Sequence, residues 1–265
     1  MKKIIVSLAP VKASIPLQIA DLANDVKKSV EAGAVMCHLH SRTKNGDLSP
    51  DTSYMIECFE RIRKDTDVII QVSTGGVSPM SIEERCNPLD YEKAETASLN
   101  GGSVNLGEAV YKNSFEDIRY CARTVYERSI FPEIEIFDIS MIHNIELVAR
   151  DVPFRQPILY NLVFGHQGGI QADIKSLYAF QSFIPDDALW GVTHYGRDNW
   201  TFLAAAIAMG ASLVRIGFED SSYLSPATRA SYNYQLVERL VQLIRSMGLD
   251  AATPGEARHL LSLTK

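Results

Sequence analysis

The sequence lacks the cysteine patterns that mark disulfide-stapled proteins and CxxC metal or redox sites. It contains only four cysteines in 265 residues, and no two of them stand at CxxC spacing. Small secreted domains are far richer in cysteine, so this usage is typical of reduced thiols in a cytoplasmic protein. The four are Cys37, Cys58, Cys86 and Cys121.

Long hydrophobic runs and an excess of positive charge are also missing. No segment approaches the ~20 consecutive apolar residues of a membrane span. The start, MKKIIVSLAP, places two lysines before an apolar run, but Pro10 and Lys12 interrupt that run, so we do not expect a signal peptide. The formal net charge of −6 disfavours nucleic acid or an anionic membrane as main partner, because both bind basic surfaces. An anionic small molecule remains compatible with this charge.

Short apolar runs alternate with amphipathic stretches along the whole chain. This alternation predicts a parallel sheet whose strands are connected by crossover helices. We count eight such units, which favours an α/β fold of the (β/α)8 TIM-barrel type, formed as a single domain by residues 1–265. The predicted strands are 4–9, 34–41, 68–74, 96–104, 131–138, 157–165, 189–196 and 213–218, and the predicted helices are 17–32, 51–65, 81–86, 113–129, 139–150, 173–183, 198–209 and 226–247.

The end of the chain carries clear helix signals. Apolar residues recur at helical spacing over 236–247, and Gly248 is expected to cap that helix at its C-terminus. Thr253, Pro254 and Glu256 then supply an N-cap, a proline at the first helical position and a capping-box glutamate. A last short helix is therefore expected to follow the eighth unit.

Two histidines, His38 and His40, stand near the carboxyl end of the second predicted strand. Side chains two residues apart share one face of a strand, so both imidazoles face the barrel interior. The intervening apolar residues face the helices. Paired imidazoles that converge on one point suit a divalent metal ion such as zinc. The alternative is a pair of hydrogen-bonded core histidines.

The last predicted strand repeats this logic with charged residues. Arg215, Gly217 and Glu219 share one face, opposite Val214 and Ile216. Charged groups inside a barrel cost several kcal/mol unless they are paired or bound to a ligand. A buried structural ion pair is one reading. However, Glu219 falls at the carboxyl end of the strand, where barrel enzymes place their active sites, and it would complete a catalytic His2Glu zinc site.

Three further strands add polar side chains to the same interior. One carries Gln71 and Ser73, and another carries Glu133 and Glu135. The convergence of polar groups from five strands predicts a site, because packing alone would favour apolar residues there. Thr96, Ser98 and Asn100 share the inward face of the third, and we expect Asn100 to contact substrate.

Glycine pairs follow several of the predicted strands, at 75–76, 101–102 and 168–169. Turn chemistry alone explains such pairs. The functional reading is that main-chain amides approach a phosphate or carboxylate group closely after a strand. None of the pairs belongs to a P-loop or a dinucleotide-binding fingerprint.

The motifs together resemble one enzyme family. They occur in this order: CHLHSR (37–42), QVSTGG (71–76), ASLNGGSVN (97–105), PEIEIFD (132–138), LVFGHQGG (162–169), GRDN (196–199) and VRIGFEDS (214–221). The chain resembles the β-keto acid cleavage enzymes over nearly its whole length, and HLH with VRIGFED is the most diagnostic part. The resemblance implies a zinc-dependent (β/α)8 barrel, commonly a homotetramer. It also implies that a β-keto acid and acetyl-CoA are exchanged for acetoacetate and a shorter acyl-CoA.

Carried over by position, the resemblance assigns roles to single residues. His38, His40 and Glu219 correspond to the zinc ligands, and the metal would act as a Lewis acid on the substrate. Arg215 and Asp220 correspond to the catalytic pair, in which Asp220 removes a proton from the α-carbon. Because Asp220 would pair with an arginine, a lowered pKa is expected for it.

The resemblance also indicates residues that bind the substrate. Ser73 corresponds to a substrate-binding serine, and Ser98 stands where the family's founding activity has threonine. Glu133 corresponds to a pocket glutamate. The first strand departs from the family, with Lys12 where an acidic or polar residue is usual. Lys12 would suit a distal carboxylate or hydroxyl, or point to solvent, so a dicarboxylic or neutral β-keto acid is favoured over an amino-hexanoate.

Two other functions fit the same residues. One is a metal-dependent keto-acid aldolase or lyase that needs no CoA and therefore no phosphate-binding turns. The other is a non-catalytic metal or metabolite binder built on the barrel, since one fold hosts many functions. In that second case Arg215 and Asp220 would be dispensable.

Overall fold

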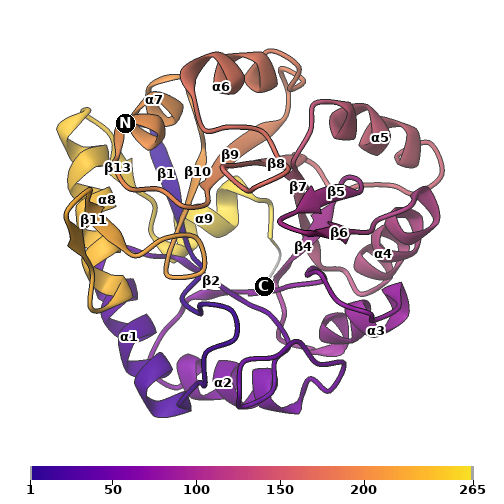
Figure 1. Ribbon diagram of the computed structural model, residues 1–265, viewed down its shortest axis with the longest axis horizontal. Helices are drawn as coiled ribbons and strands as arrows, with labels where there is room; N and C mark the ends of the chain where they lie inside the picture. The colour runs from indigo at the N-terminus through magenta and orange to yellow at the C-terminus, as the bar shows by residue number, and fades with distance from the viewer. Residues whose placement is uncertain (1, 264–265) are drawn as a thin grey trace.

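The computed structural model describes residues 2–263 and contains a closed barrel of parallel strands (Figure 1). The hydrogen-bonded order runs β10-β9-β8-β7-β4-β3-β2-β1, and β10 pairs again with β1 to close the ring. The predicted TIM-barrel class is thus confirmed. The barrel strands are β1 (Lys3–Leu8), β2 (Met36–Leu39), β3 (Ile69–Val72), β4 (Thr96–Asn100), β7 (Phe131–Ile136), β8 (Leu159–Phe164), β9 (Leu189–His194) and β10 (Leu213–Ile216).

Helices surround the barrel on its outer side, as the ring of coils in Figure 1 shows. Each follows a strand, as the alternating sequence pattern predicts. They are α1 (Ile19–Ala32), α2 (Ser53–Arg63), α3 (Ile82–Cys86), α4 (Phe115–Glu127), α5 (Ser140–Val148), α6 (Ile174–Gln181), α7 (Thr201–Ala208) and α8 (Asn233–Ser246), with a 3-10 turn, η1, at Asn87–Asp90. Across residues 2–263, no helix is long and apolar enough to cross a membrane.

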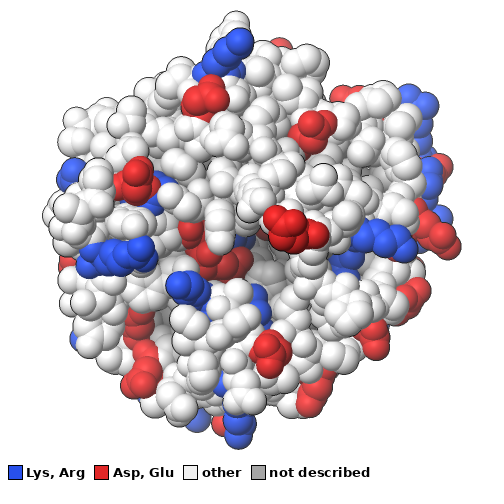
Figure 2. Space-filling model, viewed as in Figure 1, with Lys and Arg blue, Asp and Glu red and all other residues white. Residues whose placement is uncertain are grey.

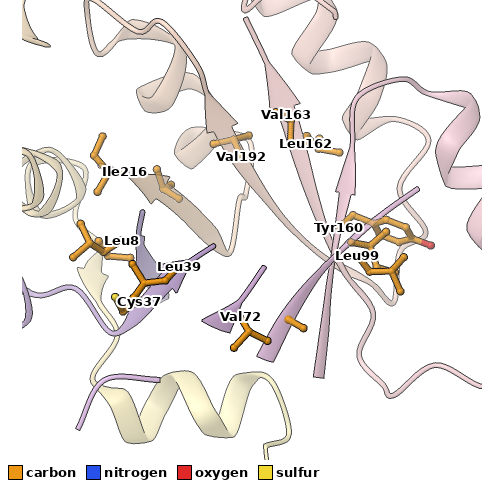
Figure 3. Close-up of a cluster of buried hydrophobic side chains, with 14 of the residues drawn as sticks. Leu8, Cys37, Leu39, Val72, Leu99, Tyr160, Leu162, Val163, Val192 and Ile216 are labelled. Atoms are coloured by element: carbon orange, nitrogen blue, oxygen red, sulfur yellow. The ribbon is translucent and has the colours of Figure 1, made fainter. Parts of the chain in front are cut away.

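The main core lies between the strands and this ring of helices. Along β1, Ile4, Val6 and Leu8 are fully buried in it, while Ser7 faces the barrel interior. The same alternation places Ile134 and Ile136 outward on β7, as predicted. Figure 3 shows part of this core, with Leu8, Cys37, Leu39, Val72, Leu99, Tyr160, Leu162, Val163, Val192 and Ile216 labelled.

A smaller apolar cluster closes the amino ends of the barrel strands. It contains Ile5, Met36 and Leu213 from the strands. These pack with Ala257 of the last helix, α9 (Pro254–Leu260), and with Leu261, which directly follows that helix. The capping box that begins α9 is present as predicted, and the short β13 (Asp250–Ala251) pairs with the start of β1. With this end plugged by side chains, the opposite end is left to form a site.

Two predicted elements differ from the observed ones by more than three residues at one end. The strand predicted over 96–104 ends at Asn100, because the chain turns there and forms the antiparallel hairpin β5 (Val104–Leu106) and β6 (Ala109–Tyr111). The helix predicted from residue 226 begins at Asn233, since a second hairpin, β11 (Tyr223–Ser225) and β12 (Thr228–Arg229), occupies its first turns.

The ends of α8 depend on contacts that the local sequence does not reveal. The carboxylate of Asp25 in α1 accepts hydrogen bonds from the backbone amides of Asn233 and Tyr234, which fixes the start of the helix. At its other end Met247 is the C-cap, and Gly248 follows with a φ of 75°. Gly248 therefore supplies the left-handed residue that ends the helix, as predicted, directly after the C-cap residue Met247.

Candidate active site

A cavity of about 730 Å³ opens at the carboxyl ends of the barrel strands. Figure 2 shows the surface hollowed at the centre of this face, with acidic side chains inside the hollow and basic ones beside it. Its size is within the usual range of small-molecule sites. The polar residues that line it include His40, Arg42, His166, Arg215, Glu219 and Asp220.

His38, His40 and Glu219 converge at this cavity as the sequence predicts. One candidate ligand atom from each lies within 4.8 Å of the others. Nε2 of His40 is 3.2 Å from Oε1 of Glu219, and Nε2 of His38 is 3.9 Å from the same oxygen. Two imidazole nitrogens and one carboxylate oxygen form a donor set that suits zinc and leaves coordination positions for substrate.

Both imidazoles have their Nδ1 atoms engaged away from this point. Nδ1 of His38 is 2.8 Å from Oε1 of Gln71, and Nδ1 of His40 is 3.1 Å from the carbonyl oxygen of Gly75. Both partners accept hydrogen bonds, so the protons belong on Nδ1 and each Nε2 keeps its lone pair, which faces Oε1 of Glu219. Nε2 of His38 is buried and has no hydrogen-bond partner among residues 2–263. An unpartnered, buried imidazole nitrogen of this kind is expected at a metal ligand before the ion binds.

Charge in the cluster also favours a cation. Burial lowers the pKa of His38 to about 3, so its imidazole is neutral. Burial alone would raise the pKa of Glu219, but Arg215 and the two histidines together bring it well below its ordinary value. A neutral imidazole and an ionised carboxylate are the forms that bind metal. The residues therefore fit a divalent ion.

Arg215 and Asp220 form a buried, two-pronged ion pair beside the histidines. Nε of Arg215 donates to Oδ2 of Asp220 at 3.0 Å, and Nη2 donates to Oδ1 at 2.7 Å. The sequence-based expectation of a lowered pKa for Asp220 is wrong. Burial raises the pKa of Asp220 and outweighs the opposing effect of Arg215, which also serves Glu219.

Comparisons with known proteins agree with this site. The family model described as beta-keto acid cleavage enzyme matches residues 8–263. The chain belongs to this family. It is 35% identical over 254 residues to the 3-keto-5-aminohexanoate cleavage enzyme of Fusobacterium nucleatum subsp. nucleatum, covering 95% of this chain and 92% of the relative. It is 31% identical over 255 residues to the 3-oxoadipate:acetyl-CoA acetyltransferase of Cupriavidus necator, covering 94% and 88%.

A solved structure supports the barrel independently. The ternary complex of ObcA with C4-CoA adduct and oxalate superposes with a TM-score of 0.77, over 94% of this chain and 68% of that one. At 16% identity this likeness concerns the fold. The family resemblance seen in the sequence is confirmed, and with it the prediction of an enzyme that acts on β-keto acids.

Glu135 is a titratable group of this β-keto acid cleavage enzyme for which the sequence indicates no specific role. It lies on β7 with its Oε1 atom 3.5 Å from Nη1 of Arg215. Burial raises the pKa of Glu135 to about 7, despite the opposing charge of Arg215. A carboxyl group with this pKa can give or take a proton near neutrality. The alternation of side chains along β7 predicts that Glu135 points into the barrel, and this inward carboxyl group is the sequence feature that could have indicated a role for it.

The predicted substrate-binding residues Ser73, which directly follows β3, and Ser98, on β4, lie close to the histidines. The hydroxyl groups of Ser73 and Ser98 are 3.3 Å apart, and that of Ser73 is 3.4 Å from Nε2 of His40. Asn100 accepts a hydrogen bond from the amide of Gly102, while its side-chain nitrogen is buried with no partner in the described part of the chain. The hydroxyl group of Tyr111 is unpartnered in the same sense. Asn100 and Tyr111 thus each have a buried donor group that no described residue accepts.

Like Ser73, Ser98 and Asn100, the two other predicted substrate-binding residues are not among the residues that line the cavity. Glu133 is 1% exposed, and its two oxygens accept hydrogen bonds from Gln71 and Asn161. Lys12 is exposed at the surface, next to Ala13, which does line the cavity. The contact of either residue with substrate stays a prediction.

Cationic and aromatic residues of the cavity wall had no predicted role, although Arg42 and His166 stood within the motifs that carried the resemblance. Arg42 follows the second histidine and lines the cavity, with one guanidinium nitrogen donating to the carbonyl of Gly46. The rings of His166 and Tyr195 stack at 4.0 Å on the wall, and burial lowers the pKa of His166 to about 4. A neutral, stacked imidazole here offers a flat surface to a ligand.

Close packing disfavours a side chain at two glycines that follow barrel strands, Gly75 and Gly217. A Cβ at Gly75 would lie 2.5 Å from the hydroxyl oxygen of Tyr111. Gly217 has a φ of 145°, and a Cβ there would meet the carbonyl oxygen of Ala9 at 2.1 Å. Both glycines bring strand ends together around the site. Binding of phosphate groups by the glycine turns stays a prediction.

Proposed function

We propose that this β-keto acid cleavage enzyme is a zinc-dependent acyltransferase that converts a β-keto acid and acetyl-CoA into acetoacetate and a shorter acyl-CoA. The acetyl carbonyl carbon becomes bonded to the α-carbon of the β-keto acid. The bond from that α-carbon to the original keto carbon breaks, and the CoA sulfur ends on the released acyl group. Family membership supports the β-keto acid, and a relative named as an acetyl-CoA-dependent acetyltransferase supports the co-substrate.

The observation that carries this proposal is the placement of a metal-ligand cluster against an arginine–carboxylate pair. His38, His40 and Glu219 would hold the ion through their Nε2 and carboxylate atoms, and Arg215 with Asp220 lies directly beside them. When bound, the ion would supply Lewis-acid polarisation of a substrate carbonyl. Zinc is the proposed metal because the donor set is two imidazoles and one carboxylate.

Asp220 is the proposed base. Its raised pKa makes it a stronger base than an ordinary carboxylate, and the two hydrogen bonds from Arg215 fix its direction. It would take the proton from the α-carbon of the keto acid. Glu135, with a pKa of about 7, lies beside the same guanidinium and is placed to give or take a proton there.

The remaining polar groups bind and orient the keto acid. Ser73, Ser98 and Asn100 would donate hydrogen bonds to its oxygens, since the Asn100 amide nitrogen has no other partner in residues 2–263. Holding the substrate in one orientation lowers the entropic part of the barrier. The cavity is large enough for a small keto acid and the thioester end of CoA.

For the substrate tail, we propose an anionic or neutral group. Lys12 suggested this class from the sequence, and Arg42 strengthens it because its guanidinium lines the cavity itself. An arginine in a partly buried wall attracts carboxylates and repels ammonium groups. A homotetramer, which rests on the family resemblance alone, and a cytoplasmic location, which rests on the cysteine usage, complete the proposal.

The experiment is a turnover assay on zinc-loaded protein with and without acetyl-CoA. β-Keto acids with cationic, neutral and anionic tails are supplied in parallel, and acetoacetate release is measured. Acetoacetate that depends on acetyl-CoA supports the proposed acyl transfer. Cleavage without acetyl-CoA would instead establish the CoA-independent lyase. Stoichiometric zinc with no turnover of any keto acid would favour the binding protein.

A further inference from the structure

A chain of buried side chains crosses the barrel interior next to His38. His38 on β2 contacts Gln71 on β3, and Gln71 contacts Glu133 on β7. Asn161 on β8 donates to the other oxygen of Glu133 at 2.6 Å and also contacts Thr193 on β9. All five side chains are 1% exposed or less. Five strands of the barrel thus hold one continuous hydrogen-bond chain that ends at a candidate metal ligand.

The chemistry of the groups fixes the direction of this chain. An ionised carboxylate only accepts hydrogen bonds, whereas a primary amide has one accepting and one donating end. Glu133 faces the amide nitrogens of both Gln71 and Asn161, at 2.8 and 2.6 Å. The nitrogen of Gln71 is therefore committed to Glu133. Its oxygen must face Nδ1 of His38, which lies 2.8 Å away.

The orientation of the Gln71 amide determines whether Nε2 of His38 has a lone pair free to bind metal. A carbonyl oxygen at Nδ1 requires a proton on that atom, so Nε2 of His38 is left unprotonated. If the amide of Gln71 were reversed, its nitrogen would donate to Nδ1, and the proton would move to Nε2. That tautomer cannot coordinate a cation through Nε2.

We propose that Glu133 is a positioning residue that acts through Gln71 to hold His38 in its metal-binding tautomer. This inference rests on the proposed metal centre and gives Glu133 a role other than substrate contact. His40 does not share this dependence. Its Nδ1 faces the backbone carbonyl of Gly75, which has no reversed orientation. The effect is therefore confined to one of the two imidazoles.

The test compares zinc affinity in variants of this chain without substrate present. Glu133→Gln replaces the two accepting carboxylate oxygens by one amide oxygen and one amide nitrogen. The side-chain amide of Gln71 can then adopt the reversed orientation. Gln71→Met removes the partner of His38 altogether. We expect either change to weaken zinc binding by about 10–100-fold, the usual cost of losing a hydrogen bond behind a metal ligand. Competition with a chromophoric chelator measures the affinity.

A matched double variant separates orientation from mere loss of packing. In Glu133→Gln combined with Asn161→Asp, the carboxylate moves to position 161 and accepts from the amide nitrogen at position 133. The amide oxygen at position 133 then faces Gln71 and restores its direction. The double variant is expected to recover zinc affinity to within a few-fold of the original chain. A purely structural role for Glu133 predicts no such recovery.

A second measurement reads the tautomer directly. Nitrogen-15 NMR of labelled histidine in the metal-free protein distinguishes a proton on Nδ1 from one on Nε2. We expect the Nδ1–H form of His38 in the original chain and a changed signal in Gln71→Met, with thermal unfolding used to show that the variants fold. Unchanged zinc affinity and an unchanged His38 tautomer in folded variants would overturn the inference alone. A wild-type chain that binds no zinc would overturn the proposed metal centre as well.

Discussion

The guanidinium of Arg215 joins Glu219 to Asp220. Its Nη2 atom donates to Oε1 of Glu219 at 2.9 Å and to Oδ1 of Asp220 at 2.7 Å, while Nε donates to the second oxygen of Asp220. One rigid group therefore sets the position of a proposed metal ligand relative to the proposed base. A lysine has a single ammonium and cannot reproduce this fork.

The first prediction concerns this fork. Arg215→Lys retains the charge but loses the two-pronged contact, so kcat is expected to fall on the order of 100-fold while the protein stays folded. The measurement is steady-state turnover at equal zinc content. Arg61→Lys, at an exposed arginine paired with Asp65, is the matched control and should keep full activity. An Arg215→Lys enzyme with unchanged kcat would remove the fork from the mechanism.

The second prediction tests the base. Asp220→Asn has nearly the same shape but cannot take a proton, so kcat is expected to fall about 100- to 10,000-fold. Zinc content should remain stoichiometric, because Asp220 is not one of the clustered ligand residues. Turnover and metal content are measured on the same preparation. Normal turnover in this variant would show that another group accepts the α-proton.

The third prediction concerns metal removal. Chelation should abolish activity and lower the unfolding temperature, since an ion at about 100 times its dissociation constant adds about 2.7 kcal/mol to the free energy of unfolding. His40→Ala should lose both effects. His143→Ala is the control, because His143 is exposed and lies on α5 away from the cluster. If chelation leaves activity intact, the metal-centre proposal is wrong.

The fourth prediction concerns pH. Burial raises the pKa of Glu135 from its ordinary 4.5 to about 7, so the folded protein binds a proton more tightly there than the unfolded chain does. The stabilisation is fully present below pH 4.5 and is lost as pH rises through 7. Glu135→Gln should flatten this decline by about 1–3 kcal/mol. Chemical unfolding from pH 5 to 8 measures it, and parallel profiles for the two proteins would contradict the assignment.

The fifth prediction separates Arg42 from Lys12. Arg42→Gln should raise KM for β-keto acids with anionic tails by about 10-fold or more, because a partly buried charge pair contributes a few kcal/mol. Neutral-tailed acids should be affected less. Lys12→Gln is the matched change at an exposed residue and tests the sequence-based alternative. A larger effect at Lys12 than at Arg42 would reverse the assignment.

Strand alternation made the barrel and much of the candidate site predictable. His38, His40, Arg215 and Glu219 were found because polar residues at inward positions contradict an apolar core, and the structure places them together. Element ends were harder where the decisive contact is distant, as with Asp25 at the start of α8.

Electrostatic properties were less accessible from sequence than positions were. The pKa of Asp220 depends on burial and on Arg215 being shared with Glu219, and neither can be read from the spacing of the residues. The hydrogen bonds of Glu133 depend on Gln71 and Asn161 from two other strands. Its inward direction was predictable, but its partners required the closed barrel.

The most direct test of the proposed reaction follows carbon from labelled acetyl-CoA. Zinc-loaded enzyme is incubated with an unlabelled β-keto acid and acetyl-CoA carrying carbon-13 in both acetyl carbons, and products are analysed by NMR. Acyl transfer predicts label in the keto and methyl carbons of acetoacetate, with an unlabelled acyl-CoA formed in equal amount. Unlabelled acetoacetate, or cleavage of the keto acid with acetyl-CoA left intact, would contradict the proposed function.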